Sequence, residues 1–194
     1  MNYLAHIYLS GNSEGITIGN FIADGIKGKK YQKYPLEIQK GILLHRGIDS
    51  FTDQHPTVRK STKRMHENYG HYSGVIVDIL YDHFLAKNWK NYSDVPLAIY
   101  IQDFYTLLRS NFEILPSRIQ NMMPYMISDN WLLSYASVPG ISKILVQMNR
   151  RTKNISKMNF AVIELEKYYD EFEEEFTSFF TELQQFSKEK LLTL

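Results

Sequence analysis

The sequence predicts a single all-α domain that spans residues 1–194. Helical patterns run along almost the whole chain, whereas strand alternation and Asn-Gly hairpin signals are missing. Near the C-terminus, apolar side chains recur at alternating spacings of four and three, which is typical of a helix in a bundle. A chain of 194 residues that is 44% hydrophobic can also bury one full core. We therefore expect a helical bundle without a sheet.

Four helices are expected in the first half of the chain, with glycine or proline near their ends. The first runs from Ser13 to Ile26, where glycines mark its end. Pro35 suits the first turn of the second helix, which continues until Pro56 stops it. The third extends from 57 to about 67. The fourth is an apolar stretch over 75–89 that neither glycine nor proline interrupts.

Proline and polar residues separate the helices of the second half. One helix is expected over about 96–112, shorter ones after Pro116 and Trp131, and another over about 141–151. The last is predicted as one long helix over about 159–192. Its apolar stripe consists of Leu165, Tyr169, Phe172, Phe176, Phe179, Leu183 and Phe186. The acidic residues between these positions form the solvated face of the same helix.

Composition excludes several classes of function. Lys and Arg total 22 against 21 Asp and Glu, so no overall charge indicates binding to nucleic acid or to a membrane surface. The absence of cysteine excludes disulfides, zinc–thiolate sites, iron–sulfur clusters and a cysteine nucleophile. No apolar run reaches membrane-spanning length, and the N-terminus lacks the pattern of a signal peptide. We expect a soluble cytoplasmic protein.

Two aspartates in the most apolar helix are the first sign of a functional site. Asp78 and Asp82 are four residues apart and share one face of the helix over 75–89. Apolar residues surround them, so we expect at least part of the pair to be buried. Two buried carboxylates side by side are unfavourable without a cation. The sequence thus predicts a metal ion or an arginine between them.

Two further helices carry polar pairs at the same spacing. His45 and Asp49 share one face of the second helix, and Asn20 and Asp24 share one face of the first. Imidazole and carboxylate groups that project inward from facing helices can bind a divalent metal ion in a bundle. Three such pairs on three helices favour a metal centre. The alternatives are that Asp78 and Asp82 form structural ion pairs, with Arg46 for example, and that His6 is a core histidine.

The same residues lie in motifs that resemble the bacterial acyl carrier protein phosphodiesterase family, also called acyl carrier protein hydrolase. These motifs are Met1–His6, Gly19–Asp24, Gly41–Asp53, Asp78–Leu85 and Ser128–Leu132. They occur in the family's order and spacing. Beyond Tyr135 the similarity is limited to helical character. The family is regarded as a divergent branch of the HD-type metal-dependent phosphohydrolases, which implies an HD-like helical bundle. The adjacent His-Asp dipeptide that names the superfamily is absent, because Arg46 follows His45.

The resemblance implies hydrolysis of the phosphodiester that joins 4′-phosphopantetheine to a serine of acyl carrier protein. It also implies a divalent cation, Mn²⁺ or Mg²⁺. We assign the metal centre to Asp24, His45, Asp49, Asp78 and Asp82. Arg46 is the candidate for neutralising the phosphate or an aspartate. His6 or His83 is the candidate for protonating the leaving serine oxygen.

Four lysines directly after the first helix are a candidate docking surface for the carrier. They are Lys27, Lys29, Lys30 and Lys33. Carriers of this kind are generally acidic, so a basic rim beside the site would attract them. A plain solvated loop is the alternative for this segment. The sequence also leaves open a nucleotide or small phosphate ester as substrate, and a non-catalytic helical module that binds proteins.

Overall fold

The computed structural model describes residues 1–194 and confirms the all-α fold class. It contains eleven α-helices and six short 3₁₀-helices, with no strand. The α-helices are α1 (Tyr3–Tyr8), α2 (Glu14–Ile22), α3 (Leu36–Gln54), α4 (Pro56–Tyr69), α5 (Ser73–Lys87), α6 (Leu97–Ser110), α7 (Ser117–Ser128), α8 (Trp131–Ser134), α9 (Val138–Arg151), α10 (Ala161–Lys167) and α11 (Tyr169–Leu192). The 3₁₀-helices are η1 (Ala23–Gly25), η2 (Gly28–Lys33), η3 (Gly70–Tyr72), η4 (Trp89–Asn91), η5 (Phe112–Ile114) and η6 (Met158–Phe160).

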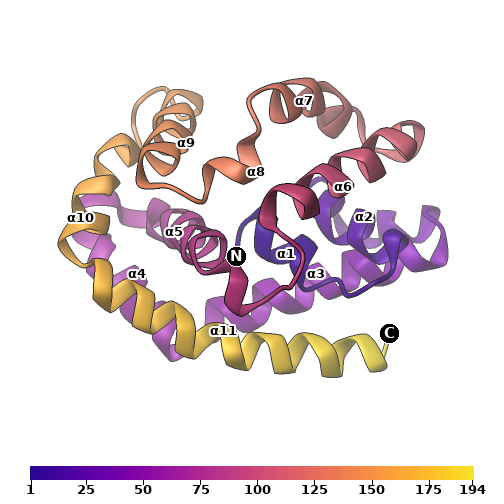
Figure 1. Ribbon diagram of the computed structural model, residues 1–194, viewed down its shortest axis with the longest axis horizontal. Helices are drawn as coiled ribbons and strands as arrows, with labels where there is room; N and C mark the ends of the chain where they lie inside the picture. Colours follow the sequence, from indigo (N-terminus) through magenta and orange to yellow (C-terminus); the bar gives the residue numbers. More distant parts are fainter.

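Helix α5 lies near the centre of the bundle and is seen almost end-on in Figure 1. Apolar side chains cover nearly all of its circumference, as expected for a helix surrounded by others. Helices α1, α4, α9 and α11 all pack against it. Forty-seven buried apolar residues join into one continuous core around these helices. No helix is both long and apolar enough to cross a membrane.

Helices α2 and α3 make the most extensive helix pair of the fold, and glycines allow their close approach. Gly19 of α2 lies against Gly41 of α3. A Cβ atom on Gly41 would lie 2.2 Å from the carbonyl oxygen of Ile16, and one on Gly19 would lie 2.1 Å from the carbonyl oxygen of Ile38. Only glycine permits backbones to approach this closely. The crossing brings the C-terminal end of α2 and η1 against the middle of α3.

The C-terminal helix is divided, in contrast to the single helix predicted from the sequence. Tyr168, with φ −121° and ψ 35°, separates α10 from α11. The apolar stripe continues across the break, and Leu165 and Phe172 on either side are both fully buried. Periodicity therefore cannot reveal a change of direction at one residue. The sequence also gave no signal for α1, which is only six residues long.

Candidate metal centre

A pocket with a volume of about 420 Å³, called the main pocket below, lies between two groups of helices. Helices α1, α2, α3 and α5 form one wall, and α7, α8 and α9 form the other (Figure 1). Four carboxylates line the pocket, namely those of Asp24, Asp49, Asp53 and Asp78. Two histidines line it as well, His6 from α1 and His45 from α3. Most of the predicted polar pairs therefore meet in one cavity.

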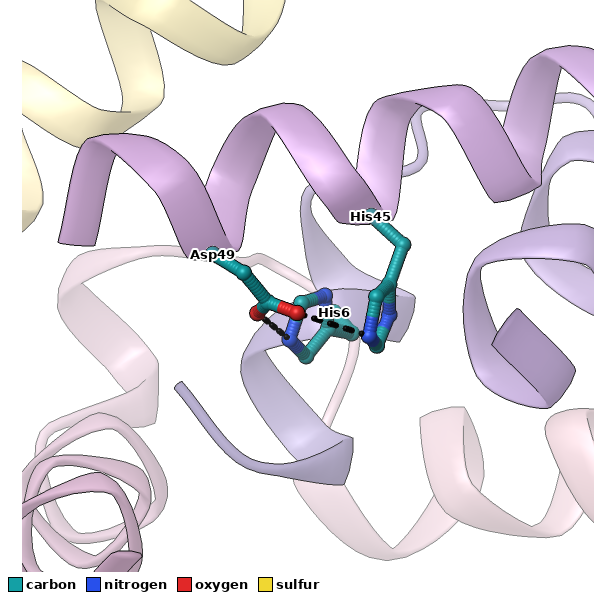
Figure 2. Close-up of side chains that lie close together, drawn as sticks. All are labelled: His6, His45 and Asp49. Atoms are coloured by element: carbon teal, nitrogen blue, oxygen red, sulfur yellow. Dashed lines mark ion pairs between the residues drawn. The ribbon is translucent and has the colours of Figure 1, made fainter. Parts of the chain in front are cut away.

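His6, His45 and Asp49 form the tightest group of potential metal ligands (Figure 2). Their ligand atoms all lie within 4.8 Å of one another. Nε2 of His6 is 3.3 Å from Oδ1 of Asp49, and Nε2 of His45 is 3.1 Å from Oδ2 of the same carboxylate. The two imidazole rings stack with centroids 4.0 Å apart. Two imidazole nitrogens and a carboxylate that converge in this way suit a divalent transition-metal ion.

The buried amide of Asn20 orients both histidines. Its Nδ2 donates to the carbonyl oxygen of His6 and to Oγ of Ser10, so its Oδ1 must accept. Nδ1 of His6 donates to that Oδ1 over 2.8 Å, and Nδ1 of His45 donates to the carbonyl oxygen of Asn20 over 2.8 Å. Each Nδ1 therefore carries a proton, and each Nε2 is the atom available to a metal ion.

Asp24 completes the group from the side of η1. Its Oδ1 lies 3.2 Å from Nε2 of His45, and its side chain is exposed and lines the pocket. The hydrogen bond from His45 is the main cause that lowers the pKa of Asp24. The close crossing of α2 and α3 explains this contact, because Gly19 and Gly41 lie within one or two turns of Asp24 and His45 respectively.

The pKa values of the two histidines are shifted in opposite directions. Burial disfavours the charged form of both rings. In His45, hydrogen bonds to Asp24 and Asp49 outweigh burial and raise the pKa to about 9. In His6, burial and the charge of His45 keep the pKa below its usual value. At neutral pH a divalent cation must therefore displace a proton from Nε2 of His45, so its binding is linked to proton release.

Main-chain groups, and no arginine, are the partners of the Asp78 and Asp82 carboxylates, which corrects the expectation of an arginine between them. The α-amino group of Met1 lies 2.9 Å from Oδ1 of Asp78. Asp82 is fully buried and accepts hydrogen bonds from the backbone N–H groups of Asn2, Leu4 and Ala5. Asp82 therefore caps the N-terminus of α1 and does not join the His6–His45–Asp49 group. Burial raises the pKa of Asp82 to about 7, although the α-amino charge and two of these N–H groups oppose the increase.

Substitution of Asp82 should reveal this capping role. Asp82→Ala leaves three backbone N–H groups, two of them buried, without this acceptor and should lower the free energy of unfolding by about 3 kcal/mol, whereas Asp82→Asn retains an acceptor and should cost less. Both proteins should keep wild-type metal content, measured by atomic absorption after Mn²⁺ loading and desalting. Asp103→Ala, an exposed change in α6, is the control for removal of a carboxylate. A stable Asp82→Asn protein that has lost its metal would contradict the assignment.

Two side chains predicted to be catalytic have structural partners outside the cluster. Arg46 donates to the carbonyl oxygens of Ile26 and Gly28, and its guanidinium stacks on Tyr31. It thus holds the segment after Asp24 and does not pair with an aspartate. His83 is buried, and does not line the pocket. Its ring nitrogens contact the carbonyl oxygen of Tyr135 and the hydroxyl of Tyr169. Hydrogen bonds therefore occupy both ring nitrogens of His83, and main-chain carbonyl oxygens hold one terminal nitrogen of Arg46.

The four lysines of the candidate docking surface lie in η2 and just before it. All four side chains are exposed, and none lines the pocket. They follow η1, which carries Asp24 at the pocket, so the segment is adjacent to the site in the chain. The residues are Lys27, Lys29, Lys30 and Lys33.

Sequence reasoning missed several residues that build the site. It placed Asn20 beside Asp24 but did not identify its contacts with His6 and His45. It also left out Arg118 and Arg151, which line the opposite wall. The helical spacing of Ile144, Gln147, Met148 and Arg151 was a usable signal, since these positions share one face of α9. All four line the pocket.

Comparisons with known proteins agree with this arrangement of motifs. The family model described as acyl carrier protein phosphodiesterase matches residues 1–183. Proteins named acyl carrier protein phosphodiesterase from Pectobacterium atrosepticum and Serratia proteamaculans are 31% and 30% identical to this chain. In each case the match covers 99% of this chain and all of the relative. The relative of that name from Yersinia pestis is 29% identical over 98% of this chain and 99% of its own length. No solved structure matches the chain significantly. The chain belongs to the acyl carrier protein phosphodiesterase family.

Proposed function

We propose that this protein hydrolyses the phosphodiester between 4′-phosphopantetheine and a serine of holo acyl carrier protein. Water attacks phosphorus, the bond from phosphorus to the serine oxygen breaks, and apo carrier and 4′-phosphopantetheine are released. The observation that carries the proposal is the convergence of His6, His45 and Asp49 in the main pocket of a chain from this family. We further propose that residues 1–194 work as one catalytic domain, since one core supports every side chain of the site.

His6, His45, Asp49 and Asp24 are the residues we propose to hold a divalent cation. Two imidazole nitrogens with carboxylate oxygens are a mixed ligand set, which favours Mn²⁺ over Mg²⁺, an ion that prefers oxygen ligands. When bound, such a cation lowers the pKa of water and screens the charge on phosphoryl oxygens. Asn20 fixes the orientation of both histidines, and Asp78 lines the pocket beside them without belonging to the ligand group.

Mass spectrometry of the carrier tests the proposed reaction. Holo acyl carrier protein incubated with this protein and Mn²⁺ should lose the mass of 4′-phosphopantetheine, while a sample with excess EDTA should keep it. Mg²⁺ in place of Mn²⁺ should support a slower reaction. An unchanged carrier together with rapid hydrolysis of a nucleotide would favour the small phosphate ester as substrate. If neither the carrier nor the nucleotide is hydrolysed, and the protein binds no metal, the non-catalytic module is favoured.

The basic segment after Asp24 is our proposed docking surface for the carrier. Replacing Lys27, Lys29, Lys30 and Lys33 with glutamate should raise the KM for holo carrier, chiefly through slower association, and the effect should shrink with added salt. Turnover of a small phosphodiester should change little. Steady-state kinetics on both substrates at two salt concentrations provide the measurement.

A second basic surface serves as the comparison for this experiment. Arg59 and Lys63 of α4 line a shallow groove that shares Asp53 and Asp78 with the main pocket. Their neighbours Lys60 and Arg64 are instead paired with Glu175. An unchanged KM in the lysine variant, with a raised KM after charge reversal of Arg59 and Lys63, would place docking on α4. Equal losses on carrier and small substrate would mean that the lysines support the site or the fold.

A further inference from the structure

Two arginines, on α7 and α9, line the pocket that holds the metal-ligand group. Arg118 belongs to α7 and Arg151 is the last residue of α9, and both line the same cavity as His6, His45 and Asp49. Both side chains are exposed to solvent. No ion pair or hydrogen bond joins either guanidinium to another residue of the protein. The guanidinium of Arg151 stacks on Trp131, at 5.4 Å from the ring centroid.

The charges that line the pocket are mostly negative, and these arginines offset part of them. Four carboxylates line the cavity, and the α-amino group that also lines it is already paired with Asp78. An anionic phosphate that enters would therefore meet net repulsion from the first wall unless a cation offset it. Arg118 and Arg151 are the only cationic side chains among the lining residues besides the histidines. Unpaired guanidinium groups retain all their donors for a ligand.

The electrostatics of Tyr3 indicate that the arginines act across the cavity. Tyr3 belongs to α1, three residues before His6, and lines the pocket. Burial raises the pKa of its hydroxyl, Asp24 adds to the increase, and the charges of Arg118 and Arg151 both oppose it. Asp24 and both arginines line the same cavity as Tyr3, and their charges act on its hydroxyl in opposite senses. A ligand between the walls would interact with both.

The local structure of α9 fixes the position of one guanidinium. Ile144, Gln147, Met148 and Arg151 form a stripe on the face of α9 that lines the pocket. Trp131 holds the Arg151 side chain by a cation–π contact from the N-terminus of α8. The same wall offers apolar surface from Ile144 and Met148 beside the charge. A planar guanidinium held in this way is suited to bidentate recognition of phosphate oxygens.

We propose that Arg118 and Arg151 form an anion-binding pair that holds the phosphate group of the phosphopantetheine moiety opposite His6, His45 and Asp49. The identity of that moiety rests on the proposed function, whereas the recognition of a phosphate group does not. The two arginines act as substrate-binding residues, and the apolar surface of α9 lies beside the organic part of the ligand.

Calorimetric titration of metal-free protein in EDTA tests this pair without any catalytic step. The probes are 4′-phosphopantetheine and pantetheine, which differ only by the phosphate. Wild-type protein should bind the phosphorylated compound more tightly. Arg118→Gln and Arg151→Gln should each weaken that binding by roughly tenfold, and the double variant should remove most of the preference for phosphate. Affinity for pantetheine should stay unchanged in every variant.

Arg150→Gln is the matched control, because it removes the same charge from the adjacent residue of α9, which does not line the main pocket. It should bind 4′-phosphopantetheine as the wild type does. Equal weakening in Arg150→Gln, or wild-type binding in the double variant, would overturn the proposal. A raised KM for holo carrier with unchanged binding of 4′-phosphopantetheine would also overturn it, since the arginines would then contact the carrier's own acidic side chains.

Titration with inorganic phosphate separates this proposal from the proposed function. If the double variant loses phosphate binding while the wild type fails to release 4′-phosphopantetheine from the carrier, the anion site stands and the assigned substrate is wrong. If the wild type cleaves the carrier and the double variant binds phosphate as tightly as the wild type, the substrate stands and the anion site is wrong. Circular dichroism should show the same helix content in all variants.

Discussion

Replacement of Gly41 by alanine should destabilise the protein by about 3 kcal/mol. The new Cβ would lie 2.2 Å from the carbonyl oxygen of Ile16 and 2.8 Å from the backbone nitrogen of Asn20. Both are backbone atoms, so no side-chain rotation can relieve the overlap, and α2 must move away from α3. Because Asn20 orients His6 and His45, the movement should also weaken metal binding. Urea denaturation followed by circular dichroism measures the loss of stability.

Gly47→Ala is the matched control on the same helix. A Cβ at that position would meet only side-chain atoms of Phe186 and Lys190, at ordinary contact distances of 3.5 Å and 3.6 Å. Alanine is the better helix former, so this variant should be more stable by about 0.5–1 kcal/mol. If the Gly41→Ala variant proved as stable as the Gly47→Ala variant, the close approach of α2 and α3 at Gly41 would be contradicted.

Asp49→Asn should remove most of the affinity for the divalent cation while the fold survives. The change keeps the volume of the side chain but removes the only carboxylate that contacts both His6 and His45. Even residues that merely orient metal ligands contribute about 10–100-fold to metal affinity, so loss of a ligand should cost at least that much. Competition with a fluorescent chelator for Mn²⁺ gives the affinity, and hydrolysis of holo carrier should fall with it.

Asp53→Asn provides the comparison, since Asp53 lies one turn further along α3. Its side chain lines the same pocket but contacts neither histidine. This variant should keep Mn²⁺ affinity within a few-fold of wild type, because only a distant charge is lost. Equal losses in both variants would mean that overall negative charge, and not ligation by Asp49, determines the affinity. Wild-type affinity in Asp49→Asn would remove Asp49 from the ligand set.

The sequence was sufficient for the fold class and for part of the site. Helix boundaries at proline and glycine could be predicted because these residues restrict or relax the backbone at their own position, as at Pro35 and Pro56. The spacing of His45 and Asp49 was readable for the same reason, because both lie on one helix. Motif resemblance identified the family.

Contacts between distant segments could not be read from local patterns. Main-chain groups of Met1, Leu4 and Ala5 are the partners of the Asp78 and Asp82 carboxylates. No sequence motif predicts such contacts, because every residue has the same main-chain groups. The expectation of a cation beside these carboxylates followed from their burial, and the cation that the structure shows at Asp78 is the α-amino group of Met1. The contact between His6 and His45 depends likewise on the packing of α1 against α2. Helix α1 is too short to show a periodic pattern in the sequence.

Anomalous diffraction from crystals grown with Mn²⁺ tests the metal centre most directly. We expect a strong anomalous peak within bonding distance of Nε2 of His6, Nε2 of His45 and a carboxylate oxygen of Asp49, with Asp24 beside it. Asp82 should still accept hydrogen bonds from the first turn of α1. A peak between Asp78 and Asp82, with His6 and His45 unligated, would contradict the account.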